Sequence, residues 1–464
     1  MNKMTNSRDI YDDFRHKKIS LIFWQYALPS IIGTTVNTLY NIIDGIFIGH
    51  WIGREALSGA GIILPVMNLA AGIGMLVGIG SASRISIFLG RGEVDKAEKV
   101  AGTSFMLTAV LSGITLALLL YFIDPVLHFI GSSPTNHVYA REFLEVFLPG
   151  SIFITLTFNY NNMMRASGYP FKAMVTMFIS VIANIILAPI FIIALGWGMR
   201  GAAFATTLSM FISFLFVMQH FISKNSNIKL YRRNFRLDFT YIKSILSIGM
   251  SPFAMQVAAS VVVVFINWQL TRYAPISHVS SDDAIAGYSN ANRLITLIIM
   301  IVIGVNQGMQ PIIGYNYGSK NYARVKETFI YAVKIATVIT SVGFILGCFM
   351  PDVLVRAFSS DVDLVAISAI ALRYTTFSFA FVGFQMVTTS FFQCIGMARV
   401  SILLSLSRQL LILLPTLYIL PLFFDLDGVW ASSPTADFLS TGIAYATLYW
   451  YFKSIKRRHY PKDA

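Results

Sequence analysis

A stripe of polar side chains lies within the first long apolar segment of the chain. Its members, Asn37, Tyr40, Asn41 and Asp44, are spaced by three and four residues, so in a helix all four point to one side. A carboxylate at the centre of a bilayer costs about 2.5–3.5 kcal/mol, and such a group usually faces an internal cavity and has a function there. Asp44 is therefore the candidate for a group that binds and releases a proton or competes for a cation.

Two structural explanations of this stripe stay open. In the first, Asp44 lies in the outer half of the segment, a few turns from Trp51, and simply reaches water. In the second, the polar side chains form hydrogen bonds between neighbouring helices. Neither explanation would give Asp44 a part in chemistry.

The chain also matches itself at an offset of 228 residues. Between residues 56–100 and 284–328, eight positions are identical without a gap. The pairs that carry the argument are Gly59 with Gly287, Gly80 with Gly308, Gly90 with Gly318, Gly168 with Gly396 and, at an offset of 227, Gly201 with Gly428. Two similar halves of about 230 residues in an apolar chain indicate a transporter formed by duplication.

The second half does not repeat the acid of the first. At an offset of 223, Pro29 meets Pro252, and the counterparts of Gly33, Asn37 and Asp44 are Gln256, Ser260 and Asn267. A mechanism that needs a titrating group at this position therefore belongs to the first half alone.

Composition places most of the chain in lipid. Hydrophobic residues make up 56% and charged residues 12% of the 464 residues, with a mean hydropathy of +0.66, whereas soluble domains carry about 25% charged residues. Twelve segments exceed the ~20 residues that cross a bilayer core: 21–48, 57–88, 98–123, 140–165, 172–196, 201–222, 242–271, 284–316, 322–349, 365–393, 400–424 and 429–452. The sequence predicts an all-α integral membrane protein with twelve transmembrane helices in two six-helix bundles, related by a pseudo-two-fold axis along the membrane normal.

The net charge of +13 is distributed in a way that predicts orientation. Of 35 Lys and Arg residues, 26 fall in the termini and alternate loops of one side, including residues 84–99 and 165–172, and 5 fall in the opposite loops. This asymmetry predicts that both termini are cytoplasmic, with contact to anionic lipid as a secondary interpretation. It argues against a nucleic-acid partner. The N terminus has no apolar signal-peptide region, and we expect a monomer in the cell inner membrane.

The predicted domains follow from these segments. They are a cytoplasmic N-terminal segment (1–20), an N-terminal bundle (21–222), a basic cytoplasmic linker (223–241), a C-terminal bundle (242–452) and a basic cytoplasmic tail (453–464). Cys348 and Cys394 both lie in apolar segments, which argues against a disulfide framework.

Several other residues inside the spans are candidates for structural roles. Arg408 enters from the cytoplasmic side and Asp437 from the other, so the two could meet in depth as a structural pair. Arg293, Lys334 and Arg373 are the remaining intramembrane cations. The predicted hinge positions are Pro29, Pro189, Pro252 and Pro311, because a proline removes a helical hydrogen bond and permits a kink.

Two classes of activity find no support in the motifs. The chain has no G-x-x-x-x-G-K-[ST] sequence and no H-E-x-x-H sequence, and no close pair of carboxylates lies inside a span. ATP as a driver and an intramembrane hydrolase are therefore both disfavoured.

In combination, four motifs resemble those of the multidrug and toxic compound extrusion (MATE) family over nearly the whole chain. They are Leu39-Tyr40-Asn41-x-x-Asp44-x-x-Phe47-Ile48-Gly49, Arg165-Ala-x-Gly168-x-Pro170, the run from Asn306-Gln307-Gly308 to Gly318, and Trp430-x-x-x-Pro434-x-x-Asp437. The resemblance implies two six-helix bundles forming a V around a central cavity. It also implies export of organic cations driven by inward movement of protons or sodium ions.

The resemblance further implies a cation site in the first bundle. Carried onto this chain, its residues are Asp44, Asn161 or Asn162, Asn184 and Thr206. The sequence departs from the family at Ala188, where an acid is expected just before proline. Because hard cations prefer several charged or carbonyl oxygens, a single titrating Asp44 suits a proton better than sodium, although Na⁺ at Asp44 stays open.

We therefore expect a secondary antiporter with no cofactor, with H⁺ or Na⁺ as the coupling ion and small organic cations as solutes. The expected cavity residues are Asn37, Tyr40, Asn41, Gln256, Asn267, Asn306 and Gln310. Three alternatives stay open: a lipid-linked saccharide flippase, for which Arg293, Lys334, Arg373 and Arg408 would supply a cationic cavity; a membrane-embedded enzyme; and a receptor or scaffold that transports nothing.

Overall fold

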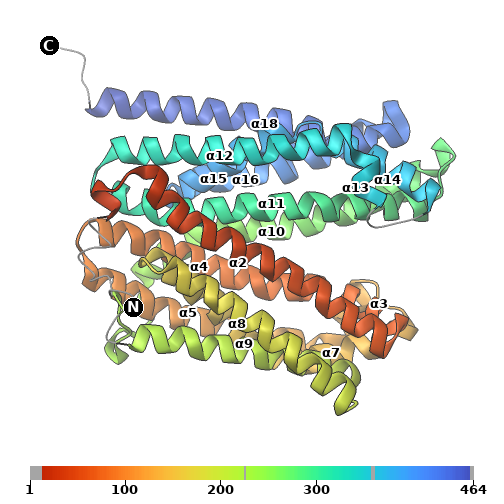
Figure 1. Ribbon diagram of the computed structural model, residues 1–464, viewed down its shortest axis with the longest axis horizontal. Coiled ribbons are helices and arrows are strands. Elements are labelled where there is room, and N and C mark those ends of the chain that lie inside the picture. The colour runs from red at the N-terminus through yellow and green to blue at the C-terminus, as the bar shows by residue number, and fades with distance from the viewer. Residues whose placement is uncertain (1–12, 224–225, 357–360, 460–464) are drawn as a thin grey trace. The chain divides into compact units, whose positions relative to one another are not determined.

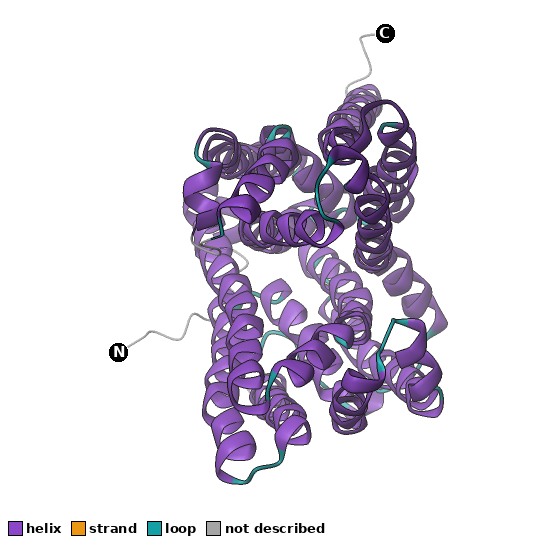
Figure 2. Ribbon diagram, turned by 90° about the vertical axis from the view of Figure 1, so that its right-hand side faces the viewer, coloured by secondary structure: helices purple, strands orange, loops and turns teal. Residues whose placement is uncertain are grey.

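The computed structural model describes residues 13–223, 226–356 and 361–459. In this part of the chain the structure consists of helices and the turns between them, with no β-strand (Figure 2). Figure 1 labels many of the α-helices, which are numbered in chain order.

The first half contains six long helical segments. They are α2 (Ile19–Phe47) with the π-helical η1 (Ile48–Ile52), α3 (Arg54–Ile62) with α4 (Leu64–Gly90), α5 (Val94–Tyr121), α7 (Pro134–Ala166), α8 (Pro170–Pro189) with the π-helical η2 (Ile190–Ala194), and α9 (Gly198–Ile222). A short α6 (Ile123–Phe129) precedes α7, and η3 (Arg232–Asn234) lies in the linker.

The second half again contains six segments. They are α10 (Phe239–Tyr273), α11 (Ser281–Gly318), α12 (Tyr322–Phe349), the pair α14 (Val362–Thr376) and α15 (Phe379–Cys394), the run α16 (Ala398–Leu406), η5 (Ser407–Leu413) and α17 (Leu414–Ile419), and α18 (Pro421–His459). The short η4 (Pro275–Ser277) and α13 (Pro351–Arg356) lie between them.

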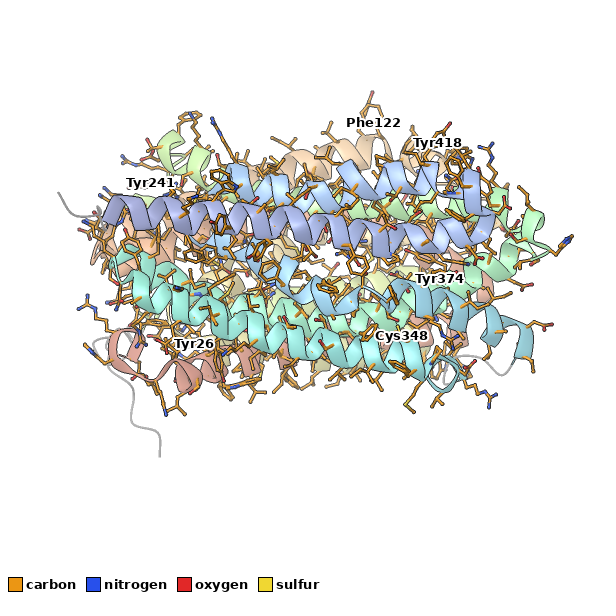
Figure 3. The ribbon with its side chains drawn as sticks, turned by 90° about the horizontal axis from the view of Figure 1, so that it is seen from above. Tyr26, Phe122, Tyr241, Cys348, Tyr374 and Tyr418 are labelled. Atoms are coloured by element: carbon orange, nitrogen blue, oxygen red, sulfur yellow. The ribbon has the colours of Figure 1, made fainter. Side chains whose placement is uncertain are left out.

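The helices have the length and composition of membrane spans. Ten described helices are long and apolar enough to cross a bilayer, and the pair α14 and α15, bent by 51°, makes an eleventh if it is one span. The twelfth predicted span, residues 429–452, lies inside α18, which is not among these. Many large apolar side chains are exposed on the helices, and Phe122, between α5 and α6, projects in the same way in Figure 3 at 45% exposure. The chain is an all-α integral membrane protein.

Helix α7 begins six residues before its predicted span, for a local reason. The Ser133 backbone N–H donates to Asn136 Oδ1 at 2.9 Å in a capping box, and Pro134 occupies the first turn. These features start a helix before the apolar run does.

The described chain divides into two compact units. Unit 1 comprises Met1–Gln256, Gln307–Thr328 and Cys394–Gly396, and unit 2 comprises Val257–Asn306, Phe329–Gln393 and Met397–Ala464. Unit 1 thus includes the first part of α10 and the last part of α11, which the predicted boundary at 242 assigned to the second bundle. The bundle boundaries themselves stay predictions.

Glycines explain why α10 and α11 contribute to unit 1. A Cβ on Gly80 would meet the backbone of Ile245, and a Cβ on Gly249 would meet the backbone of Leu76. In the same way, Gly318 leaves no room between its backbone and that of Ile87. These helices therefore touch backbone to backbone, which only residues without a side chain allow.

Candidate ion and solute site

Asp44 is buried within unit 1. It is 8% exposed, and its Oδ1 atom makes no hydrogen bond to the described residues. The structural explanation in which Asp44 simply reaches water does not fit this burial. A buried carboxylate oxygen without a donor is costly, and it is satisfied when a proton or a cation arrives.

Asp44 lies one helical turn from a buried apolar layer to which several helices of unit 1 contribute. The apolar members of that layer include Ile48 of η1, Ala188 of α8 and Ala202 of α9. Because residues four apart face the same side of a helix, the polar residues one turn away on these helices are Asp44, Asn184 and Thr206.

The register of the helices supports this placement. Asn184 Nδ2 donates to Thr206 Oγ1 at 3.3 Å, and one turn along the same antiparallel pair Ser180 Oγ lies 3.2 Å from Met210 Sδ. Helix α2 runs parallel to α8, since Gly33 packs against Met177 at one end while Ile48 and Ala188 share a cluster at the other. Asn184 and Thr206 are fully buried, at 0% and 1% exposure.

Ala188 occupies the place of the expected second acid. It is fully buried in the same apolar layer as Ile48. No group of three or more His, Cys, Asp or Glu among the described residues could hold a metal ion. The polar residues one turn from the layer thus supply one carboxylate, an amide at Asn184 and a hydroxyl at Thr206, which form a weak environment for a hard cation.

Asn161 and Asn162 lie elsewhere on α7, in a cluster around Arg165. The Arg165 guanidinium donates to Asn161 Oδ1 at 2.5 Å through Nη1 and to Asn162 Oδ1 at 2.8 Å through Nη2. On α7, Gly150 packs against Thr207, the neighbour of Thr206. Asn161 lies eleven residues beyond Gly150 on α7, which is about 16 Å along the helix axis. The structure therefore does not bring Asn161 or Asn162 to Asp44.

This placement yields a prediction for Asn162→Ala. Removing the amide leaves a buried guanidinium donor unsatisfied, which should lower the free energy of unfolding by about 1–3 kcal/mol. The ion dependence of transport should not change, because the residue lies away from Asp44. A loss of ion dependence at unchanged thermal stability would contradict this and restore Asn162 to the coupling site.

The comparisons with known proteins decide the family. The MatE family model matches residues 29–190 and 248–419. The chain belongs to the MATE family. It is 28% identical over 443 residues to multidrug export protein MepA of Staphylococcus haemolyticus, covering 93% of this chain and 95% of the relative. With MepA of Staphylococcus aureus it shares 29% over 447 residues, covering 94% and 95%.

Solved structures agree. The outward-facing conformation of a multidrug resistance MATE family transporter of the MOP superfamily matches with a TM-score of 0.89 and 26% identity, covering 96% of this chain and 98% of that one. A MATE structure in a bent conformation matches with a TM-score of 0.88 and 26% identity, covering 97% and 98%. This MATE protein is therefore a multi-pass membrane transporter of the efflux type and not an enzyme.

The predicted cavity residues fall into different surroundings. Gln310 is 7% exposed and donates to Ile79 O at 3.3 Å and to Ser83 Oγ at 3.0 Å. It thus joins α11 to α4 inside unit 1. Asn37 and Gln256 are half-buried in unit 1, and Asn267 and Asn306 are half-buried in unit 2. The side chains of Tyr40 and Asn41 lie outside the described part.

The intramembrane charges of unit 2 include the expected pair. Arg408 Nε lies 2.6 Å from Asp437 Oδ1. Arg293, Lys334 and Arg373 are exposed on the helix surfaces. The predicted hinge prolines Pro29, Pro189, Pro252 and Pro311 all lie within helices, and Pro189 directly precedes the π-helical η2.

Two helical cations escaped the sequence analysis because they were counted with loops. Helix α4 extends to Gly90 and α7 to Ala166, so Arg84 and Arg165 belong to helices. Arg165 is 4% exposed, and Arg84 Nε is buried without a hydrogen bond to the described residues. For Arg84 the one available signal was that the apolar run continues past it to Leu89. Arg165 is followed by Ala-Ser-Gly-Tyr-Pro, so no such signal existed there.

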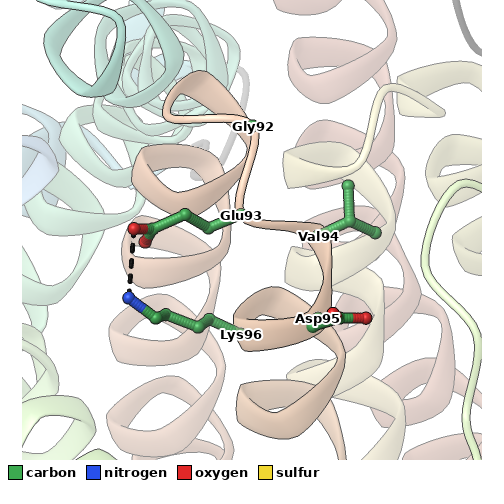
Figure 4. Close-up of a pocket in the computed structure, with 5 residues that line it drawn as sticks. All are labelled: Gly92, Glu93, Val94, Asp95 and Lys96. Atoms are coloured by element: carbon green, nitrogen blue, oxygen red, sulfur yellow. Dashed lines mark hydrogen bonds and ion pairs between the residues drawn. The ribbon is translucent and has the colours of Figure 1, made fainter.

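Two cavities of the structure lie away from Asp44. One, of about 290 Å³, lies at the turn between α4 and α5 and is lined by Gly92–Lys96, with Lys96 Nζ and Glu93 Oε1 3.0 Å apart (Figure 4). Another, of about 190 Å³, lies in unit 2 beside Trp430 and Asp427. Neither includes a predicted coupling residue.

Proposed function

We propose that this chain is a secondary active antiporter that exports amphipathic organic cations in exchange for H⁺, with Asp44 as the coupling carboxylate. The observation that carries the proposal is the burial of Asp44, with an oxygen that lacks a donor, one turn from the apolar layer to which η1, α8 and α9 contribute. The similarity to multidrug export proteins supports the solute class.

The proposed cycle uses one charge on Asp44. A cationic solute enters from the cytoplasm while Asp44 is ionised. A proton from outside then neutralises Asp44 and removes the cost of burying its charge, so the packing of α2 about Pro29 changes and release is favoured. One charge moved through about 100 mV supplies about 2.3 kcal/mol, which supports roughly fiftyfold accumulation if no charge is exported in return.

We favour H⁺ over Na⁺ because of Ala188. With Asp44 as the single carboxylate, the site offers one negative charge and neutral oxygens. A site with two acids would bind Na⁺ more tightly. The remaining elements of the proposal are a monomer in the cell inner membrane and both termini in the cytoplasm, the last supported by the 26 to 5 distribution of Lys and Arg.

Transport in proteoliposomes tests the coupling ion. Purified protein is reconstituted with a fluorescent lipophilic cation, and a pH step or a sodium step is imposed at the same magnitude. We expect uptake of the dye after the pH step and none after the sodium step. Equal uptake after a sodium step at constant pH would contradict proton coupling, and protein-free liposomes give the baseline.

A further inference from the structure

A charged cluster lies inside unit 2, where the proposed mechanism does not use it. Arg408 Nε lies 2.6 Å from Asp437 Oδ1, and Ser378 Oγ donates to Asp437 Oδ2 at 2.8 Å. The Asp437 side chain is 4% exposed and that of Arg408 is 22% exposed. The carboxylate is thus held from both sides, while the guanidinium keeps an accessible part.

The elements that carry this cluster are irregular. Arg408 belongs to the π-helical η5, and Ser378 lies at the break where α14 and α15 are bent by 51°. π-helical turns occur often at functional sites, and interrupted helices form the binding sites of many transporters. Two such irregular elements meet at this buried ion pair, which indicates that the pair has a function besides helix packing.

Arg408 retains unused donors. A guanidinium has five N–H groups, and Nη1 and Nη2 make no hydrogen bond to the described residues of the chain. Arg408 is ten residues from the start of α16 at Ala398, or about 15 Å of helix, which places it near mid-bilayer. Lipid headgroups do not reach this depth, and an arginine exposed to acyl chains there is costly. Its accessible part therefore faces the interior of the protein.

The internal repeat shows that the helices do not need these charges to pack. At offsets of 228 and 227, the counterparts of Arg408 and Asp437 are Ser180 and Met210. In unit 1 these two also touch, with Ser180 Oγ 3.2 Å from Met210 Sδ. The first half thus fills the same position with a neutral contact. Because a buried ion pair often contributes little to stability compared with apolar packing, a structural role alone explains the charges of the second half poorly.

We propose that Arg408 contacts the carboxylate, phosphate or other anionic group of an amphipathic solute, and that Asp437 and Ser378 position its guanidinium. The bond through Nε fixes the plane of the guanidinium and leaves the two terminal amino groups side by side, the arrangement that binds such groups in a bidentate manner. The inference goes beyond cation export, and it depends on the chain being a solute transporter but not on Asp44 coupling.

A matched pair of dyes tests this proposal. The probes are a rhodamine ethyl ester, which is a lipophilic cation, and the same dye as the free carboxylic acid, which is a zwitterion. Their affinities for the purified full chain are measured by fluorescence anisotropy. In Arg408→Ser/Asp437→Met, which copies the neutral contact of the first half, we expect affinity for the acid to fall on the order of tenfold and affinity for the ester to stay within about twofold.

Controls make each outcome decisive. Lys334→Ser removes an exposed cation elsewhere in unit 2 and should change neither affinity. If the double variant does not fold, Arg408→Lys decides, since it keeps the charge and loses the planar fork, and the proposal then requires a selective loss for the acid. Equal loss for both dyes, or no loss for either, overturns the proposal. Because binding is measured without an ion gradient, this result is independent of the proton coupling.

Discussion

Asp44→Asn is expected to abolish proton-driven export while the protein still folds and inserts. Asparagine has nearly the same shape as aspartate, so the packing of α2 on α8 should persist. The asparagine side chain cannot bind and release a proton. Position 44, where the parent has a buried carboxylate oxygen without a donor, therefore no longer responds to the external pH. At about 100 mV we expect the roughly fiftyfold accumulation supported by one proton to disappear.

The measurement is dye accumulation in everted vesicles after an imposed pH step, with dye binding to the purified variant as the check of folding. Glu55→Gln is the matched control, because it removes an exposed carboxylate at the start of α3. This control should accumulate dye like the parent. If vesicles of Asp44→Asn accumulate dye at the parental rate, Asp44 is not the coupling group.

The sequence predicted the helices and the burial of Asp44 because both depend on local patterns. Apolar runs of the right length mark the spans, and the spacing of the polar stripe correctly predicted an inward-facing Asp44. The departure at Ala188 was also visible, and the structure adds that this residue is packed against the same apolar layer as Ile48.

The parts that could not be predicted depend on contacts between distant segments. Asn161 and Asn162 were candidates by resemblance, yet in the structure both accept hydrogen bonds from Arg165. The sequence analysis had counted Arg165 with a loop, so its burial was not expected. Nothing in the apolar pattern of α4 says which helix will face Gly80. Periodicity reveals the buried face of a helix, but the partner of that face is a property of the folded chain.

The contact between α4 and α10 shows how much depends on such partners. Along this pair Gly80 faces Ile245, Gly249 faces Leu76, and at one end Phe88 and Tyr241 pack edge to face with their ring centroids 6.3 Å apart. In lipid no hydrophobic force draws helices together, so close packing of small residues supplies much of the attraction. Replacing one of these glycines should therefore cost more than the small added volume suggests.

Gly249→Ala is expected to destabilise unit 1 strongly. The added Cβ would collide with the backbone of Leu76, which has no flexible end that could move aside, so α4 and α10 must separate. Overpacking of this kind costs about 1–3 kcal/mol or more. Gly113→Ala is the control, since no atom lies within 4 Å of its added Cβ, and alanine in an open helix position should stabilise by about 0.5–1 kcal/mol. Thermal unfolding of the two purified variants should thus shift in opposite directions from the parent. A shift of equal size and sign in both would mean that α4 and α10 do not touch at Gly249.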